Sequence, residues 1–325
     1  MEKMIFAPDA LQDRVVLVTG ASRGIGSAIL EGFAKTGAVV VGTATSEAGA
    51  EAIGAAVAAA GGRGKGIVLN VCDAAASAKA IEDIVAEFGR IDVLVNNAGV
   101  TRDTLAMRMK DEQWDEVIDT DLTAAFRLAR ACLRPMMKQR FGRIISISSV
   151  VGAAGNPGQA NYVAANAALE VLSERARRAG FASRVIGWGP VGDVGMLKAN
   201  PSAKKILEST LGTPALDSTE VLAALDAMVE KGGNTPLHFF AIDWSRVDTL
   251  PAARDPRFAG IWATVGEKRA DAGSIRDLLT GKSEEEAVGI LTELVASEVA
   301  KLMGVAASEL NAHQPVADLG MDSLM

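Results

Sequence analysis

The sequence predicts an α/β fold, a doubly wound parallel sheet of the Rossmann type with a short helical C-terminal appendage. Short runs rich in valine and isoleucine alternate with alanine-rich stretches of helical length. These runs are nearly continuous in apolar residues, which is typical of strands buried on both faces of a parallel sheet. A glycine-rich turn also follows the first run directly and opens a helix.

Seven strands and the helices between them are expected, arranged as βαβ units with right-handed crossovers. The strands are Val15–Thr19, Ala38–Thr43, Ile67–Val71, Ile91–Val95, Arg143–Ser148, Ser183–Trp188 and a seventh candidate, His238–Ile242. The main helices are Ser46–Ala60, Ala74–Phe88, Asp119–Lys138 and Gln159–Arg178.

The pattern changes near residue 245, so three parts are expected. They are a doubly wound unit over 1–245, a linker over 246–282 and a helical segment over 283–325. Ser283 and Glu286 have the spacing of a capping box, and apolar residues recur after them every three or four positions. An amphipathic helix is therefore predicted from Ser283 to about residue 304.

Composition excludes several classes of protein. A net charge of −7 and a pI of about 5.1 argue against nucleic acid or an anionic membrane as partner. Cys72 and Cys132 lie in apolar segments and indicate neither a disulfide framework nor a metal site. No apolar run has the length of a membrane span or a signal peptide, so a cytoplasmic location is expected.

The glycine-rich turn Thr19–Gly26 has the pattern of a dinucleotide loop. Its glycines permit a tight turn, close approach of a pyrophosphate and close packing of helix on strand, and the phosphates then lie at the positive end of the helix. The alternative is a turn that binds no ligand. The loop residues expected to bind a cofactor are Gly20, Ser22, Arg23, Gly24, Ile25 and Gly26.

The end of the second strand favours NADP(H) over NAD(H). An NAD site usually offers a carboxylate there to the ribose 2′-hydroxyl, but this segment has Thr43 and reaches its first carboxylate only at Glu47. Arg23 is a candidate partner for a 2′-phosphate, the alternative being a solvated loop arginine.

Four motifs in order resemble the short-chain dehydrogenase/reductase family: Thr19–Gly26, Asn96-Asn97-Ala98-Gly99, Ser149 and Tyr162. Residues 10–165 look most like its 3-oxoacyl-[acyl-carrier-protein] reductases of bacterial fatty-acid synthesis. The resemblance implies NADPH-dependent reduction of a 3-oxoacyl thioester on an acyl-carrier protein or coenzyme A. It also implies a homodimer or homotetramer, because 119–138 and 159–178 match the family's subunit-contact helices.

Residues 162–325 resemble the end of a polyketide-synthase ketoreductase followed by the start of an acyl-carrier domain. The ketoreductase likeness rests on Tyr162-x-x-x-Asn166, Trp188-Gly189-Pro190 and Asp243-Trp244. In the carrier-like tail, Ser323 would be the phosphopantetheine serine, but the sequence ends two residues later, so its modification is not expected.

The resemblance assigns Tyr162 as general acid and Ser149 as the group that orients the carbonyl oxygen. A lysine normally lies four residues after the tyrosine, where this chain has Asn166, and ketoreductases carry their lysine at the position of Asp121. A buried anion at Asp121 would raise the tyrosine pKa. Turnover about 10²–10⁴ below that of an intact site is expected; the alternative is a silent NADP-binding structural domain.

The remaining cofactor contacts are also assigned by resemblance. Asn97, Ala98 and Gly99 would form the floor under the cofactor, and Pro190 is also expected to bind it. Asp73 matches an adenine contact of the family, although it could equally be the N-cap of the following helix.

Overall fold

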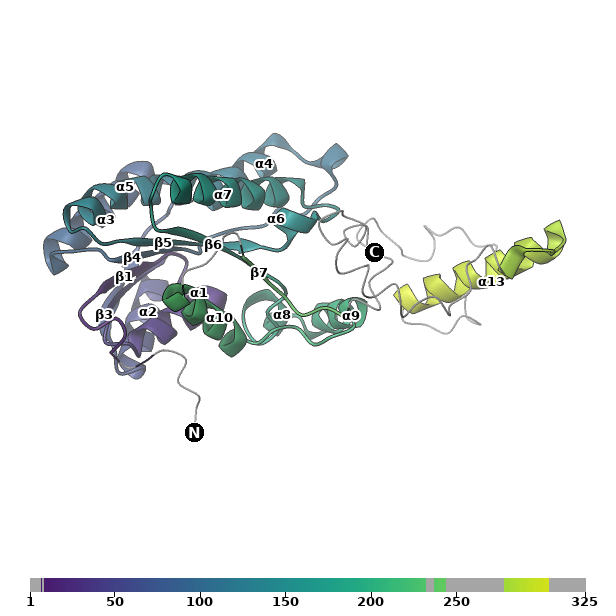
Figure 1. Ribbon diagram of the computed structural model, residues 1–325, viewed down its shortest axis with the longest axis horizontal. Coiled ribbons are helices and arrows are strands. Elements are labelled where there is room, and N and C mark those ends of the chain that lie inside the picture. The colour runs from purple at the N-terminus through teal and green to yellow at the C-terminus, as the bar shows by residue number, and fades with distance from the viewer. Residues whose placement is uncertain (1–6, 8, 232–236, 244–277, 304–325) are drawn as a thin grey trace. The chain divides into compact units, whose positions relative to one another are not determined.

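The computed structural model describes residue 7 and residues 9–231, 237–243 and 278–303 (Figure 1). The chain divides into two units, Met1–Ala253 and Arg254–Met325. Most of the predicted linker lies outside the described residues, as do Trp244, Ser323 and the carrier-like tail. The three-part division of the chain therefore stays a prediction.

The first unit contains one seven-stranded parallel sheet in the order β3-β2-β1-β4-β5-β6-β7, which confirms the predicted fold class. The order reverses direction between β1 and β4, and ligands bind at such a switch point beyond the carboxyl ends of the strands. The strands are β1 (Val15–Val18), β2 (Val39–Ala44), β3 (Arg63–Val68), β4 (Val93–Asn96), β5 (Arg143–Ser149), β6 (Ser183–Trp188) and β7 (Leu237–Phe239).

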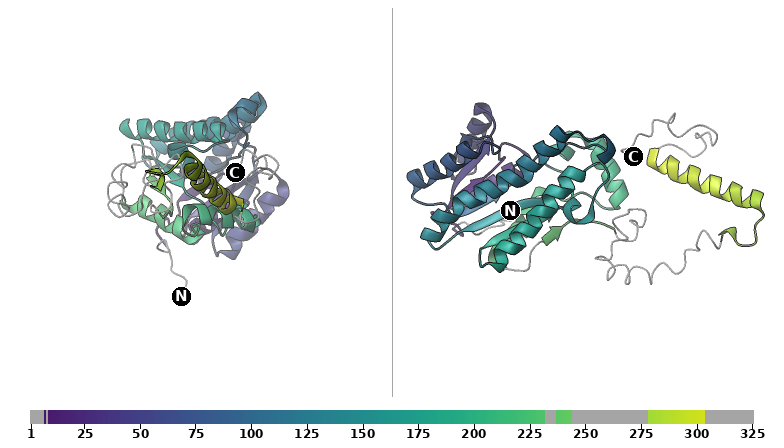
Figure 2. Two further views of the ribbon diagram at one scale, coloured as in Figure 1. Left: turned by 90° about the vertical axis from the view of Figure 1, so that its right-hand side faces the viewer. Right: turned by 90° about the horizontal axis from the view of Figure 1, so that it is seen from above.

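Helices cover both faces of the sheet (Figure 1). One layer holds α1 (Gly24–Ala34), α2 (Glu47–Ala59) and α10 (Ser218–Lys231), and the other holds α3 (Ala74–Phe88), α5 (Ala124–Lys138) and α7 (Ala160–Arg178). Seen from above in Figure 2, the helices of the second layer lie side by side across the sheet. The shorter helices are α4 (Asp111–Val117), α6 (Val151–Ala154), α8 (Gly195–Ala199) and α9 (Pro201–Leu211).

The core lies in two parts, one on each face. Val16 and Val18 of β1 pack in the cluster that includes Phe33 of α1, whereas Leu17 packs with Leu128 of α5 on the other face. Alternate residues of one strand are thus buried on opposite sides, which is why the strand sequences are apolar throughout.

The third strand differs from its predicted position. Ile67–Val71 was expected, but β3 runs from Arg63 to Val68 and pairs with Val39–Ala44 of β2. β3 is an edge strand, so its first half carries no apolar signal. A Cβ added at Gly64 would lie 1.8 Å from the carbonyl oxygen of Val40, so close approach to β2 explains this glycine.

The predicted helix over 119–138 begins with a π-helical segment, Ile118–Thr123, which continues into α5. Such segments are frequent at functional sites because they displace one side chain from the regular helical face. Here the segment carries Asp121, which is only 7% exposed.

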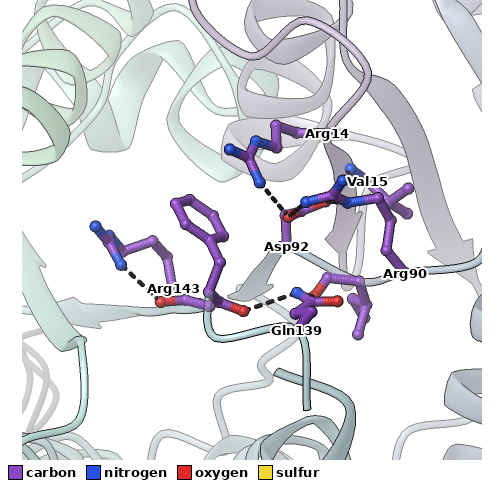
Figure 3. A network of polar contacts seen from close by, with 9 residues as sticks. Arg14, Val15, Arg90, Asp92, Gln139 and Arg143 are labelled. Carbon is purple, nitrogen blue, oxygen red and sulfur yellow. Dashed lines mark hydrogen bonds and ion pairs between the residues drawn. The ribbon is translucent and has the colours of Figure 1, made fainter. Parts of the chain in front are cut away.

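An ion-pair network joins the amino-terminal ends of the central strands (Figure 3). The buried carboxylate of Asp92 accepts hydrogen bonds from Arg14 Nη1 at 3.0 Å, Arg90 Nε at 2.7 Å and the backbone N–H of Val15 at 2.9 Å. Burial alone would raise the pKa of Asp92, but these hydrogen bonds outweigh it and hold the pKa below its usual value. The network thus lies at the end of the sheet opposite the carboxyl ends of the strands, where ligands bind at a switch point.

The described part of the second unit includes α13 (Glu284–Met303), close to the predicted range. The predicted capping box is present: Ser283 N donates to Glu286 Oε2 at 2.9 Å and Glu286 N donates to Ser283 Oγ at 3.3 Å.

Candidate active site

The glycine-rich turn connects β1 to α1 in a conformation that glycine favours. Gly20 and Gly24 have φ values of +63° and +64°. A Cβ at Gly26 would lie 2.3 Å from the carbonyl oxygen of Gly20, so only glycine fits there. The N-cap of α1, Arg23, makes no side-chain cap, which leaves the first N–H groups of the helix directed at the loop.

The turn is held by the segment after β4. Asn97 Nδ2 donates to the carbonyl oxygens of Thr19 at 2.9 Å and Gly20 at 3.2 Å, and the Thr19 hydroxyl accepts from the N–H of Asn97 and Ala98. Asn97 and Ala98 therefore shape the predicted cofactor site by fixing its loop. Thr43 does the same from β2, because its hydroxyl accepts from the N–H of Gly20 at 3.1 Å.

A cavity of about 460 Å³ opens at the switch point beside this loop. It brings together nine of the residues predicted from sequence, which come from the loop, the segment after β4, the π-helical segment, β5 and α7. They are Arg23, Ile25, Asn97, Ala98, Gly99, Asp121, Ser149, Tyr162 and Asn166.

The other predicted residues lie outside the cavity lining. Gly20, Gly24 and Gly26 form the turn, and Ser22 is exposed on it. Asp73 is the N-cap of α3, with its Oδ1 accepting from Ala76 N at 2.9 Å, which confirms the second of its two interpretations. The residue before Pro190, Gly189, lines the cavity in its place.

Asn166 joins α7 to the end of β5. Its Oδ1 accepts from Ser148 Oγ and from the N–H of Ser149, both at 3.0 Å, and its Nδ2 donates to the carbonyl oxygen of Tyr162 at 2.8 Å. The two lone pairs of the amide oxygen are thus used, so only one N–H remains for another partner. The Asn166 side chain is therefore an uncharged structural link between α7 and β5.

Two positioning residues were not predicted. Ser148 precedes the predicted serine and donates to Asn166, and Asn161 precedes the tyrosine and is fully buried. Asn161 Nδ2 donates to the carbonyl oxygens of Arg102 and Gln113, which holds the start of α7 against the neighbouring loop and α4. The sequence feature that could have indicated Ser148 and Asn161 is a polar residue within an otherwise buried strand or at a buried helix start.

Tyr162 is a weak acid in this environment. Burial is the largest cause that raises its pKa, and the charge of Asp121 is the second; hydrogen bonds with Ser149 and Asn166 act in the opposite direction. The net shift is upward, so the phenol is protonated at neutral pH. Burial thus adds to the effect that the sequence predicted from Asp121.

Asp121 is itself unusual. Burial raises its pKa to about 7, although a hydrogen bond from Val100 N to Oδ1 at 2.8 Å favours the charged form. This residue was expected to be an anion, whereas burial favours its uncharged form up to about neutral pH.

No lysine is among the residues that line the described cavity. The lining contains two arginines: Arg23 at the loop and Arg102, which is ion-paired with Glu116. Arg127 of α5 instead donates to the carbonyl oxygen of Cys72, at 3.4 Å.

The cavity fits a dinucleotide in two respects. The uncapped start of α1 and its glycine turn can accept a pyrophosphate. Within the described residues, Asn96 Oδ1 and Trp188 Nε1 are buried without a hydrogen-bond partner, and both residues belong to the cavity lining. Buried polar atoms of this kind are normally satisfied, so these two mark positions where a ligand or water can bind.

Comparison with known proteins agrees with this architecture. The sequence profile of the short chain dehydrogenase family matches residues 14–186, and the chain belongs to this family. Among its relatives is the 3-oxoacyl-[acyl-carrier-protein] reductase FabG of Escherichia coli K12, 56% identical over 167 residues, which cover 51% of this chain and 67% of the relative. The protein of the same name from Pseudomonas aeruginosa is 47% identical over 207 residues, covering 62% and 83%.

Two further properties bear on the class of protein. Among the residues that the structure describes, every helix is too short or too polar to span a bilayer. The described part of the chain also contains no group of three or more histidine, cysteine, aspartate or glutamate side chains able to hold a metal ion.

Proposed function

We propose that this protein reduces a 3-oxoacyl thioester, carried by an acyl-carrier protein or coenzyme A, to the 3-hydroxyacyl thioester with NADPH. The observation that carries the proposal is the placement of Ser149 and Tyr162 on one cavity with the glycine turn of α1. The relatives named 3-oxoacyl-[acyl-carrier-protein] reductase support the choice of substrate.

Bound NADPH would supply the hydride that reduces the carbonyl carbon. Ser149 holds the carbonyl oxygen by its hydroxyl, and Tyr162 donates its phenolic proton to that oxygen as negative charge develops. The backbone of the loop and Asn97 hold the turn in the conformation that binds the pyrophosphate. Arg23 is proposed to contact the 2′-phosphate and to select NADPH over NADH.

The turnover proposed for this site is low. Tyr162 has a raised pKa, so it gives up its proton reluctantly, and the cation that would stabilise the phenolate is replaced by Asn166. A cation close to a tyrosine changes its pKa by about one to three units, and general-acid catalysis contributes about 10²–10⁴-fold. Loss of the cation is therefore expected to cost up to this factor in kcat.

A second candidate is a silent NADP-binding domain that serves as a structural part of a synthase-type assembly. It is favoured by Asn166, because the structure uses its amide oxygen fully in linking α7 to β5. This candidate predicts cofactor binding without turnover, and the resemblance of residues 162–325 to a synthase module is its other support.

The test is the oxidation of NADPH by a 3-oxoacyl thioester, with binding of NADPH measured separately. Wild type, Tyr162→Phe and the double variant Asp121→Asn with Asn166→Lys are compared. Slow turnover in the wild type that disappears in Tyr162→Phe supports the reductase. Binding without turnover, together with fast turnover in the double variant, supports the silent domain. A wild type that binds neither NADPH nor NADH contradicts both candidates.

We also propose a homodimer or homotetramer with α5 and α7 in the contact. These helices expose large apolar side chains, Phe126 at 48%, Val171 at 53% and Leu172 at 42%, which a partner subunit would cover. Light scattering after gel filtration tests this, and a monomer at micromolar concentration would contradict it.

A further inference from the structure

Asp121 is the buried titratable group of the cavity that the proposed reaction leaves without a role. It lies on the π-helical segment, is 7% exposed and lines the same cavity as Ser149 and Tyr162. Its Oδ1 accepts from Val100 N at 2.8 Å, whereas a Cβ built on Gly99 would lie 3.2 Å from its Oδ2. Oδ2 thus faces a backbone position with no side chain and is available to carry a proton.

Of the three arginines considered around the cavity, Arg23 lies exposed on the glycine turn and the other two have partners elsewhere. Arg102, on the loop after β4, pairs with Glu116 of α4, and Arg127 of α5 donates to a backbone carbonyl. On α7 the titratable neighbour is Tyr162, whose pKa responds to the charge of Asp121 and, more weakly, to that of Asp103.

A carboxylate buried without a cation is costly, so this cavity favours neutral Asp121 until a positive charge is present. The oxidised nicotinamide ring carries one positive charge and the reduced ring carries none. To react with a carbonyl held by Ser149 and Tyr162, the ring must lie in the cavity that Asp121 lines.

We propose that Asp121 is a proton store coupled to the redox state of the cofactor: it holds a proton at Oδ2 with NADPH bound and releases it with NADP⁺ bound. The inference rests on the proposed cofactor and deepens the proposed reaction.

During reduction, hydride passes to the carbonyl carbon and the Tyr162 proton passes to the carbonyl oxygen. The proton from Asp121 can then restore Tyr162, leaving a carboxylate beside the oxidised ring. One hydride and one proton are thus consumed, and the cavity remains neutral before and after the transfer.

Titration calorimetry in buffers of different ionisation enthalpy tests the coupling, because it counts the protons released when each cofactor binds. At pH 7 more protons are expected to leave per NADP⁺ bound than per NADPH bound, with a difference of up to about one proton, because Asp121 is ionised in the first complex and protonated in the second. The 2′-phosphate also titrates near this pH, but it is present in both cofactor forms, so their difference isolates the protein group.

Asp121→Asn is expected to abolish this difference. Asp119→Asn is the matched control, because Asp119 is exposed on the same π-helical segment and should leave the difference unchanged. An infrared difference spectrum of the wild type near pH 6 provides a measurement without any variant: NADP⁺ should remove a protonated carboxyl band, and NADPH should not.

Equal proton release with NADP⁺ and NADPH, or a difference that persists in Asp121→Asn, would overturn the inference even if the enzyme turns over. Conversely, absence of turnover with any thioester, alongside NADP⁺-specific proton release, would refute the proposed reaction and leave the proton store supported. A chain that binds neither cofactor form would overturn the proton store as well.

Discussion

Asp121→Asn is expected to make the protein more stable at alkaline pH and to have little effect in acid. The pKa of Asp121 rises from 3.8 in the unfolded chain to about 7 in the folded protein. Between these values the folded state holds a proton that the unfolded state has lost, so the stability due to this group falls as the pH rises. Three pH units at about 1.4 kcal/mol each give an upper limit of about 4 kcal/mol.

Urea unfolding of wild type and variant between about pH 4 and pH 8 measures this effect. Asparagine can still accept the hydrogen bond from Val100, so any constant cost of the substitution cancels in the slope. The advantage of the variant should grow by roughly 2–4 kcal/mol across the range and level off above pH 7. For a folded unit of about 150–250 residues, 1 kcal/mol corresponds to about 2–4 °C in Tm.

Asp119→Asn is again the control, because an exposed carboxylate should add no slope. If wild type and Asp121→Asn have parallel stability curves, then Asp121 ionises normally. The conclusion that burial without a nearby cation raises the pKa of Asp121 would then be wrong.

Three further substitutions test the framework of the site. Gly26→Ala should weaken NADPH binding at least tenfold in a fluorescence titration, because its Cβ would lie 2.3 Å from a carbonyl oxygen of the loop. The control is Gly54→Ala, whose Cβ would have no atom within 4 Å; it should bind NADPH normally and gain up to about 1 kcal/mol of stability. Asp92→Ala should lower the free energy of unfolding in urea by about 3–5 kcal/mol above pH 4. Because the pKa of Asp92 is lowered in the folded protein, this loss should shrink as the pH falls below 4. The NADPH affinity should stay unchanged. Asn166→Leu should cost about 2–4 kcal/mol because three hydrogen bonds of a buried amide are lost, whereas the exposed control Asn156→Leu should change Tm little.

Much of the fold could be predicted from sequence because a parallel sheet covered on both faces requires apolar strands. β1 has four consecutive buried residues, and its predicted range differs by one residue from the observed one. β3 was misplaced because an edge strand does not need this pattern, so the apolar residues just beyond it gave a stronger signal. The buried Leu69 and Val71 pack under the sheet edge without being part of the strand.

The positions of the candidate site residues could be predicted from the sequence, but the hydrogen bonds between them could not. The spacing of Ser149 and Tyr162 brought both to the cavity, because a strand end and the start of the following helix meet at the carboxyl edge of the sheet. Asn166 links α7 to β5 in part through a hydrogen bond from the Ser148 hydroxyl. The side of the sheet on which this hydroxyl lies depends on how β5 pairs with its neighbouring strand. The sequence alone contains no comparable signal for this contact.

The charge balance of the cavity connects these observations. With Asn166 neutral and Arg102 paired with Glu116, the described residues of the cavity include no buried, unpaired cation, and burial outweighs the hydrogen bonds that favour the charged forms of Tyr162 and Asp121. Burial then favours the protonated form of both groups, which suits a site that gives protons and opposes one that accepts them. Alcohol oxidation requires a phenolate at Tyr162, and reduction does not. The kcat for oxidation of a 3-hydroxyacyl thioester with NADP⁺ should therefore increase as the pH rises above neutral, because it depends on the fraction of Tyr162 that is ionised.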